Sequence, residues 1–431
     1  MIFGISPIFA LIPLIVYIVL AFKDINPVLN VFICVIFSMI LTNHSLLTLG
    51  SELATAMGSF IAMIGFIILL GSALGAVLKK TGVAEYIVMT MMKKIGIETE
   101  KRAILAVMAC SILLVSLLGT MAGANAVIAP IVIPLVASIG ITPSALGIAL
   151  FGAGLTGLFI GPFTPPTVTV MGLTGLQYGP YLLGAALPLA LIIWITAFFM
   201  ALRTQKKTLG VYAYENVEKP EGNYQASKET RRACLVFSLT LLAMIIGGMI
   251  LKSGSSYAIL VMFTASILTG VAGGLKLSEL FDTMMEGASR MVWLFIMFVL
   301  FDPFIRFVSE AGAFTTLVGY LEPLLKSNSK VVFTFISTIT GLYGIGGAAV
   351  AQAVVIDEMF GDLSTKLQIS GTLWATILLL GSQIDSFAYP EADMLGQMGL
   401  ARSKDLKSMV KFGLTVTAVT VAYGVIRSFF G

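Results

Sequence analysis

The segment TPPTVTVMGLTGL at residues 164–176 has a counterpart, AYPEADMLGQMGL, at residues 388–400. At a constant offset of 224 residues both segments share the pattern P-x5-G-x2-G-L, which aligns Pro166 with Pro390. Each segment directly follows a long apolar run, so each interrupts a predicted membrane span. A proline and glycines at that depth leave backbone groups without helical partners, and lipid cannot form hydrogen bonds with them. We therefore expect both segments to be helix breaks that face protein or a watery cavity.

The composition predicts an integral membrane protein with many spans. Of the 431 residues, 58% are hydrophobic and 11% are charged, and the mean hydropathy is +1.00. A soluble helical protein of this length would need far more charge to cover its surface. The net charge of +4 is too small to indicate a nucleic-acid partner. The expected fold class is therefore an all-α polytopic membrane protein surrounded by a lipid bilayer.

Apolar runs occur in the same order in each half of the chain. Three spanning runs are followed by a short amphipathic stretch suited to the membrane surface, a run with a glycine-rich centre, a run that enters the break, and a final span. In the first half these are residues 5–22, 26–42, 60–78, 79–96, 102–138, 143–161 and 181–203. In the second half they are residues 232–251, 256–274, 291–308, 311–325, 330–363, 371–384 and 405–430.

The matching order predicts an internal repeat with the boundaries 1–203 for the first copy, 204–231 for a polar linker and 232–431 for the second copy. The glycine-rich centres, GTMAGANA at 119–126 and YGIGGAAVAQ at 343–352, predict two re-entrant hairpins, each made of two short helices joined at a tip. Each copy then holds five transmembrane helices and one re-entrant hairpin. An odd number of crossings inverts the second copy relative to the first.

The positive charges predict the orientation. With ten spans and two hairpins, most of the 26 Lys and Arg residues fall on the side that carries the linker. By the positive-inside rule this side is cytoplasmic, so both termini are expected outside. The expected location is the inner (plasma) membrane of a bacterial-type cell.

Polar residues near the breaks and the hairpin tips are candidates for binding, because a bilayer excludes such groups unless they function. Asp385, Glu391 and Asp393 flank the second break. We expect these three acids to couple transport to a cation, either H⁺ or Na⁺. Apart from such a Na⁺ ion, no metal and no cofactor are expected.

The first break and the tips carry hydroxyls, amides and glycines instead of acids. A broken helix exposes N–H groups and a positive dipole end that can hold a carboxylate. Threonines in membrane helices also commonly bind their own backbone, which is the alternative role for them here. The predicted substrate-binding residues are Gly123, Asn125, Thr164, Thr167, Gly346, Gly347 and Gln352.

Other polar residues have structural interpretations. Asp302 and Arg306 stand four residues apart in an apolar span, which predicts an ion pair on one helical face. His44, the only histidine, follows the second span in a polar turn and is expected at the surface. The chain has no Walker pattern, Cys/His cluster or nucleophile elbow, so we do not expect an enzyme.

Together, the five spans and one hairpin per half and the paired breaks, GPFTPPTVTVMGLTGL and DSFAYPEADMLGQMGL, resemble the ion transporter superfamily. That group includes gluconate/proton symporters, citrate and C4-dicarboxylate carriers, and a branch of sodium/proton antiporters. The segment LLGSQIDSFAYPEADMLGQMGL looks most like the gluconate- and citrate-type permeases. The resemblance implies a secondary active transporter whose scaffold helices form a homodimer. In place of the Ser-Asn-Thr tips of the sodium/dicarboxylate branch, this chain has Ala-Asn-Ala at 124–126 and Gly-Ala-Ala at 347–349.

We therefore predict an ion-coupled symporter of a small organic anion, such as a carboxylate or a sugar acid, with the first break serving the substrate and the second the driving ion. The alternative is a Na⁺/H⁺ antiporter that uses the same acids. It is favoured by the acidic second break, which carries no arginine to neutralise an anion. A membrane-embedded scaffold without transport is a third interpretation, and the acids at the break argue against it.

Overall fold

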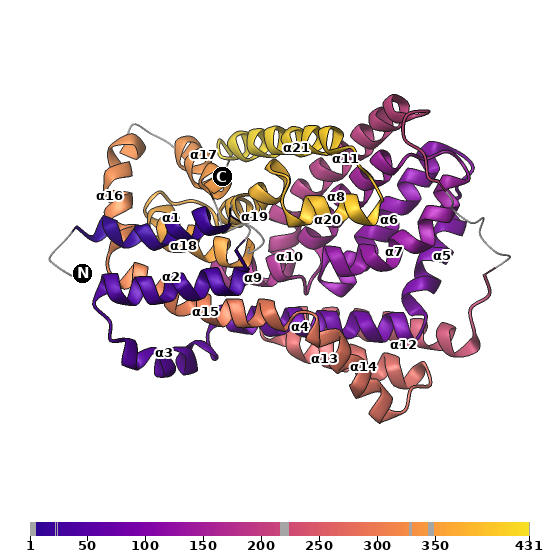
Figure 1. Ribbon diagram of the computed structural model, residues 1–431, viewed down its shortest axis with the longest axis horizontal. Helices are drawn as coiled ribbons and strands as arrows, with labels where there is room; N and C mark the ends of the chain where they lie inside the picture. The colour runs from indigo at the N-terminus through magenta and orange to yellow at the C-terminus, as the bar shows by residue number, and fades with distance from the viewer. Residues whose placement is uncertain are drawn as a thin grey trace.

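The computed structural model describes residues 6–21, 23, 25–215, 224–326, 330–343 and 349–430. Within these ranges the chain forms helices joined by turns and loops, with no β-strand. Most long helices, among them α2, α4, α12 and α21, run along the longest axis of the molecule (Figure 1). The predicted all-α polytopic fold is therefore confirmed.

The first half of the chain contains η2 (Pro7–Leu11), α1 (Ile12–Ala21), α2 (Pro27–Thr42), η3 (Leu46–Thr48), α3 (Leu49–Ala56), α4 (Phe60–Lys80), α5 (Val83–Ile95), α6 (Glu100–Leu118), α7 (Met121–Ala137), α8 (Pro143–Ile160), α9 (Pro165–Thr174), α10 (Tyr178–Tyr181), η4 (Leu182–Ala186) and α11 (Leu187–Thr208). The second half contains α12 (Lys228–Ile250), α13 (Tyr257–Ala272), α14 (Leu277–Ser289), α15 (Val292–Glu310), α16 (Ala313–Lys326), α17 (Lys330–Thr340), η5 (Gly341–Tyr343), α18 (Ala349–Lys366), α19 (Gly371–Ala388), α20 (Ala392–Leu400) and α21 (Leu406–Arg427). Among the described residues, 7 helical segments are long and apolar enough to cross a membrane.

The sequence interpretation missed α3 and α14. Both are short, carry acidic residues and precede a long span, so neither produced an apolar run of spanning length. α14 buries only Leu280, Met284 and Gly287, which lie on one side of the helix. A Cβ on Gly287 would lie 2.6 Å from the Ser72 carbonyl of α4. This glycine therefore lets α14 pack directly against the backbone of α4.

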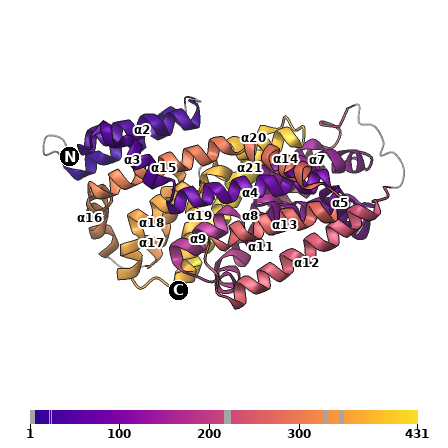
Figure 2. The ribbon, with the colours of Figure 1, turned by 90° about the horizontal axis from the view of Figure 1, so that it is seen from below.

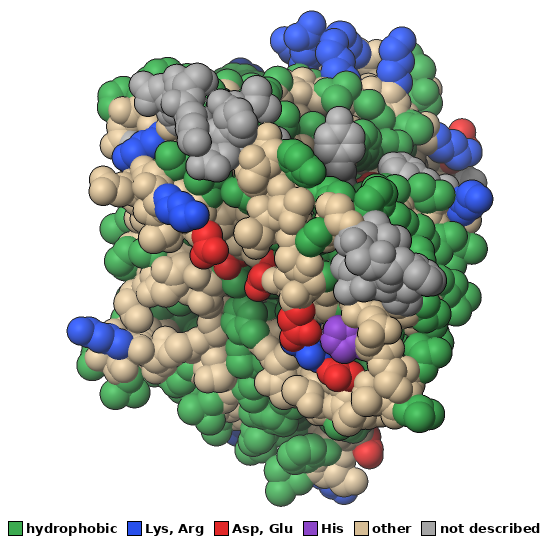
Figure 3. All heavy atoms as spheres, turned by 90° about the vertical axis from the view of Figure 1, so that its left-hand side faces the viewer, with side chains coloured by type: hydrophobic (Ala, Val, Ile, Leu, Met, Phe, Trp, Pro, Cys, Tyr) green, Lys and Arg blue, Asp and Glu red, His purple; other side chains and the backbone are tan. Residues whose placement is uncertain are grey.

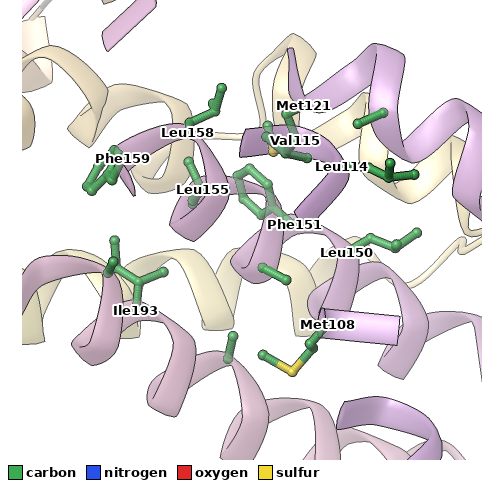
Figure 4. Close-up of a cluster of buried hydrophobic side chains, with 14 of the residues drawn as sticks. Met108, Leu114, Val115, Met121, Leu150, Phe151, Leu155, Leu158, Phe159 and Ile193 are labelled. Carbon is green, nitrogen blue, oxygen red and sulfur yellow. The ribbon is translucent and has the colours of Figure 1, made fainter. Parts of the chain in front are cut away.

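α8 and α19 form the centre of the molecule. Every residue of α8 from Pro143 to Phe159 is buried, and so is every residue of α19 from Leu373 to Ala388. Figure 4 shows Phe151 and Leu155 of α8 among side chains from α6, α7 and α11. A helix that is apolar on all sides suits such a central position. Because lipid is as apolar as the core, close packing rather than exclusion of water holds these helices together.

The small residues of α8 allow that packing. A Cβ on Gly157 would lie 2.8 Å from the Ile112 carbonyl, and a Cβ on Gly152 would overlap Ala197. The GAGLTG segment at 152–157 therefore serves close packing between helices.

The two halves are interlocked through their short helices. α9 of the first half packs against α18 and α19, while α20 of the second half packs against α7 and α8. The long helices exchange partners in the same way, since α2 packs against α15 and α4 against α13. The halves therefore share one packed interior, and each short helix that follows a break lies against helices of the other half.

The two ends of the long axis differ. α5 lies at one end and α16 at the other (Figures 1 and 2). The end that carries α16 displays acidic side chains near the single histidine (Figure 3). Arg306 lies 3.7 Å from Asp302, as predicted, but its closest partner is Glu52 of α3 at 2.6 Å. His44 is partly exposed and stacks on Phe307, which confirms its surface position.

Candidate functional site

The first break lies between α8 and α9, at residues 161–164. It comes earlier than expected, because Pro165 and Pro166 occupy the first positions of α9 and Gly172 lies inside that helix. The first turn of a helix needs no N–H donors, so prolines fit there and start the helix instead of interrupting it. Gly175, with φ of 68°, ends α9 in the left-handed conformation that favours glycine.

Hydroxyl groups cover the carbonyls that the first break exposes. The hydroxyl of Thr164 lies 2.5 Å from the Leu158 carbonyl and 3.0 Å from that of Gly161. The hydroxyl of Thr167 lies 2.9 Å from that of Thr164 and 3.1 Å from the Phe159 carbonyl. Both threonines are fully buried. Their hydroxyls therefore already have protein partners, as expected for threonines that cap their own backbone.

Two tyrosines that the sequence interpretation did not select complete this cap. Tyr181 donates its hydroxyl to the Phe159 carbonyl at 2.9 Å, and Tyr178 donates to the Ile160 carbonyl at 2.6 Å. They stand three residues apart, just after α9, in the otherwise weakly polar stretch QYGPY. A pair of tyrosines that closely follows a break is the signal that would have found them.

The second break lies between α19 and α20, at residues 389–391, and carries acids where the first carries hydroxyls. Asp385 is 3% exposed, in the last turn of α19. Its Oδ1 accepts a hydrogen bond of 2.8 Å from the Ser386 N–H. Glu391 and Asp393 are partly exposed and lie within electrostatic range of Asp385. The structure thus brings the three predicted ion-coupling acids together, and Asp385 forms no ion pair with any described basic residue.

Tyr17 of α1 is a further polar residue near the second break. It is 1% exposed and lies within electrostatic range of Asp385 and Glu391. Its ring packs edge-on against Phe301 of α15, with centroids 5.4 Å apart. A single tyrosine within the aliphatic stretch IPLIVYIVLA was the only signal for this residue.

The first hairpin consists of α6 and α7, joined by Gly119 and Thr120. Gly119 has φ of 72° and lies beside the first break, close to Phe163, Thr164 and Pro165. The tip is shorter than predicted, since α7 is already helical from Met121. Helix formation there satisfies the backbone of the glycine-rich stretch and leaves only two residues for the turn.

The predicted residues Gly123 and Asn125 lie on opposite faces of α7. Gly123 is exposed and lines a cavity, whereas Asn125 is fully buried against α8 and α20. The amide of Asn125 donates to the Gln397 side chain at 2.7 Å. The structure therefore brings Asn125 to α20, on the face of α7 that points away from the cavity.

The second hairpin consists of α17, η5 and α18. Its predicted tip residues Gly346 and Gly347 lie outside the described residues. Gln352 is buried, and its amide donates to the Gly341 carbonyl at 2.7 Å and to the Gly381 carbonyl at 2.6 Å. Gln352 therefore ties this hairpin to α19 of the same half, close to the second break.

A cavity of about 520 Å³ lies between α4, α14 and the first hairpin. Leu118, Thr120 and Gly123 line its hairpin wall, and Gly71 and Gly75 line the wall formed by α4. Of these helices, α14 and α7 lie toward the end of the molecule that carries α5 (Figure 2). The cavity therefore adjoins the tip of the first hairpin.

Three basic residues are among those that line this cavity. Lys79, Lys80 and Arg290 line it together with one acid, Glu286. Lys80 lies 3.2 Å from Glu279, and Arg290 lies 2.8 Å from Glu286. Lys79 forms no ion pair with another described residue. Its charge is therefore not compensated locally, which favours negatively charged solutes in the cavity.

Comparisons with known proteins find similarities to transporters. A family model described as the Na⁺/H⁺ antiporter family matches residues 1–200. No curated protein matches the sequence. The fold is similar to that of the YdaH transporter of Alcanivorax borkumensis, whose crystal structure is described as having an unusual topology. The TM-score is 0.65 and the sequence identity 14%, over 94% of this chain and 99% of that chain.

Neither match is to a gluconate- or citrate-type permease, so that part of the resemblance stays a prediction. At 14% identity, the likeness to the YdaH transporter concerns the fold alone. That likeness covers almost the whole of both chains. The protein therefore has the all-helical, multi-pass fold of a membrane transporter.

Proposed function

We propose that this protein is an ion-coupled secondary active transporter of a small organic anion, such as a carboxylate or a sugar acid. The observation that carries the proposal is the cavity of about 520 Å³ that reaches the first hairpin and is bordered by Lys79, Lys80 and Arg290. A cavity with an excess of positive charge concentrates anions from the adjoining solution. Gly123 and Thr120 on the hairpin wall are the first groups of the tip that such an anion would meet.

The driving cation, H⁺ or Na⁺, binds at the second break in this proposal. An ionised carboxylate that is taken out of water is stable only with a compensating positive charge. Asp385 has no basic partner among the described residues, and Glu391 and Asp393 add negative charge nearby. A proton or a sodium ion at Asp385 supplies the missing charge.

The proposed topology has two inverted repeats, residues 1–203 and 232–431, joined by a cytoplasmic linker. The opposite positions of α5 and α16, which have equivalent places in the two halves, support the inversion (Figure 1). The re-entrant nature of the second hairpin is supported by the length of α17, since its 11 residues span only about 16 Å, about half of a bilayer core. In this topology the protein lies in the inner membrane and the end with α5 faces the cytoplasm. Both termini lie on the opposite, outer side.

A Na⁺/H⁺ antiporter is the second candidate function. The family model over residues 1–200 favours it, and the acidic second break suits exchange of two small cations at one site. The cavity and its basic border are the features that an antiporter without an organic substrate would not need.

Uptake by the purified protein in proteoliposomes tests the proposal. A panel of labelled carboxylates and sugar acids is offered under an imposed proton or sodium gradient, and a pH-sensitive dye reports Na⁺-driven proton movement in parallel. Gradient-dependent uptake of at least one organic anion is the expected result. Na⁺-driven proton flux without uptake of any anion would identify the antiporter instead.

Light scattering of the detergent-solubilised protein tests the expected homodimer.

A further inference from the structure

A cluster of buried amide and hydroxyl groups joins the first hairpin to the helix that follows the second break. The Ser111 hydroxyl of α6 donates to the Asn125 side-chain oxygen at 2.8 Å. The Asn125 amide donates to the Leu150 carbonyl of α8 at 3.1 Å and to the Gln397 side-chain oxygen of α20 at 2.7 Å. Ser111, Asn125 and Gln397 are all fully buried. Four helices therefore meet at one hydrogen-bonded cluster in an apolar interior.

Gln397 is only partly satisfied in this cluster. Its oxygen accepts from Asn125, but its Nε2 group has no partner among the described residues. A buried donor without a partner costs free energy, which an apolar side chain of similar size would avoid. At the equivalent position of the first half, 224 residues earlier, the chain has Leu173. The first half thus has no amide at this place, and the bond to Asn125 is a feature of the second half alone.

The position of Gln397 connects that bond to the acids. α20 has only 9 residues, with Glu391 as its N-cap and Asp393 in its first turn. Gln397 stands four residues after Asp393, so the two side chains share one face of the helix. A helix of this length moves as one body, and a shift at its acidic start therefore displaces Gln397 as well.

At the other end of the bond, Asn125 lies in the second turn of α7. The opposite face of that helix, with Gly123 and Ala126, lines the cavity. Displacement of Asn125 by α20 therefore moves the cavity wall at which the proposed anion binds.

We propose that the Asn125–Gln397 hydrogen bond is a coupling link, through which a cation at the second break sets the position of the first hairpin. Gln397 is then a positioning residue that acts through α7 and does not itself touch either solute. This inference rests on the proposed function, because it assumes that the acids of the second break bind a cation. It adds the path by which that cation controls the anion site.

The test follows the cavity wall directly and needs no knowledge of the transported anion. Cys34, Cys110 and Cys234 are replaced by alanine in the full chain, and Ala126→Cys places a single thiol on the cavity face of α7. Its labelling rate with a water-soluble maleimide is measured in proteoliposomes with sodium chloride or choline chloride, each at acidic and neutral pH. We expect Na⁺ or protons to change the rate by at least about fivefold, a common size for coupling between two sites.

Gln397→Leu is expected to remove this response, so that the rates with and without the cation become equal. The matched control is Gln205→Leu. Gln205 is also a buried amide with several bonds, to Glu100, Gly140 and Thr142, but it lies away from both breaks. The control should lower thermal stability and keep the cation response. The double variant Asn125→Gln with Gln397→Asn exchanges the two amide side chains and keeps their combined length. It should restore part of the cation response that Gln397→Leu loses.

The outcomes separate the link from the proposed function. If Asp385→Asn abolishes the response but Gln397→Leu retains it, the second break binds the cation and the coupling link is wrong. If the protein with the single thiol at residue 126 and native Gln397 shows no cation response at all, the link is wrong, and the flux of Asp385→Asn then decides whether the cation site is also wrong. Loss of the response in Gln205→Leu as well as Gln397→Leu would also overturn the link, because general destabilisation would then explain both.

Discussion

The two helix breaks are built in opposite ways. At the first, the hydroxyls of Thr164, Thr167 and two tyrosines cover the carbonyls at the end of α8. At the second, the equivalent of Thr167 is Glu391, and the buried carboxyl of Asp385 stands six residues before it, in the last turn of α19. The first break is thus satisfied by the protein itself, whereas the second carries acidic charge that a cation would balance. The difference supports our proposal that the first break is a fixed structural element and that the second binds the ion.

Asp385→Asn is the change expected to have the largest effect on this contrast. It removes the buried charge while it keeps the size of the side chain, so the cation loses its main partner. Gradient-driven flux in proteoliposomes should fall to the level of liposomes without protein. The control Asp282→Asn, at an exposed acid on α14, should keep the flux of the parent. Normal flux in Asp385→Asn would remove this residue from the mechanism.

Gln352→Leu tests whether the stability of the second hairpin depends on the side-chain amide of Gln352. The substitution leaves the carbonyls of Gly341 and Gly381 without this donor, a loss of about 1–3 kcal/mol in stability. Thermal unfolding of the detergent-solubilised protein measures the effect. The control is Gln225→Leu, a substitution at an exposed glutamine. An unchanged unfolding temperature would mean that other groups satisfy both carbonyls.

Thr164→Val tests whether the first break is structural. Valine keeps the shape but removes the hydroxyl at the Leu158 and Gly161 carbonyls, so stability should fall by about 1 kcal/mol. The dependence of flux on the driving cation should stay that of the parent. A protein with parental stability but a much weaker apparent affinity for the anion would instead make Thr164 a substrate ligand, as the sequence-based hypothesis has it.

Lys79→Gln is expected to have the smallest effect. An exposed charge contributes at most about 1 kcal/mol, so the KM for the anion should rise by less than about fivefold. The rise should shrink at high salt, because dissolved ions screen exposed charges. Lys93→Gln on α5, which is exposed and lies outside the cavity lining, should leave KM unchanged. Equal KM values for all three proteins would remove the cavity charge from anion recognition.

Hydropathy and the repeated pattern were sufficient to predict the long helices of the fold, because spanning segments must be long and apolar. Residues 164–176 and 388–400 were predicted as breaks, but most of each segment forms a short helix, α9 and α20. They were not sufficient for α3 and α14, whose short amphipathic faces are determined by contacts with helices distant in sequence. The acids of the second break were also predictable, since a carboxyl next to an interrupted span is rare and costly.

The partners of the polar side chains were not predictable in the same way. Asn125 was expected to bind substrate, yet it lies on the side of α7 that faces Gln397, 272 residues later in the chain. The capping role of Tyr178 and Tyr181 follows from the position of their hydroxyls at the end of α8, which the sequence does not show. A hydrogen-bond partner across the fold leaves no local pattern in the sequence.

The equivalent positions Thr167 and Glu391 allow the most direct test of the contrast between the breaks. The concentration of H⁺ or Na⁺ that gives half-maximal flux is measured for Thr167→Val and Glu391→Gln side by side. Glu391→Gln should raise that concentration by at least about tenfold, equivalent to a loss of about 1.4 kcal/mol in cation binding, while Thr167→Val should change it by less than about twofold. Equal shifts in the two variants, or a larger shift in Thr167→Val, would contradict the assignment of the cation to the second break.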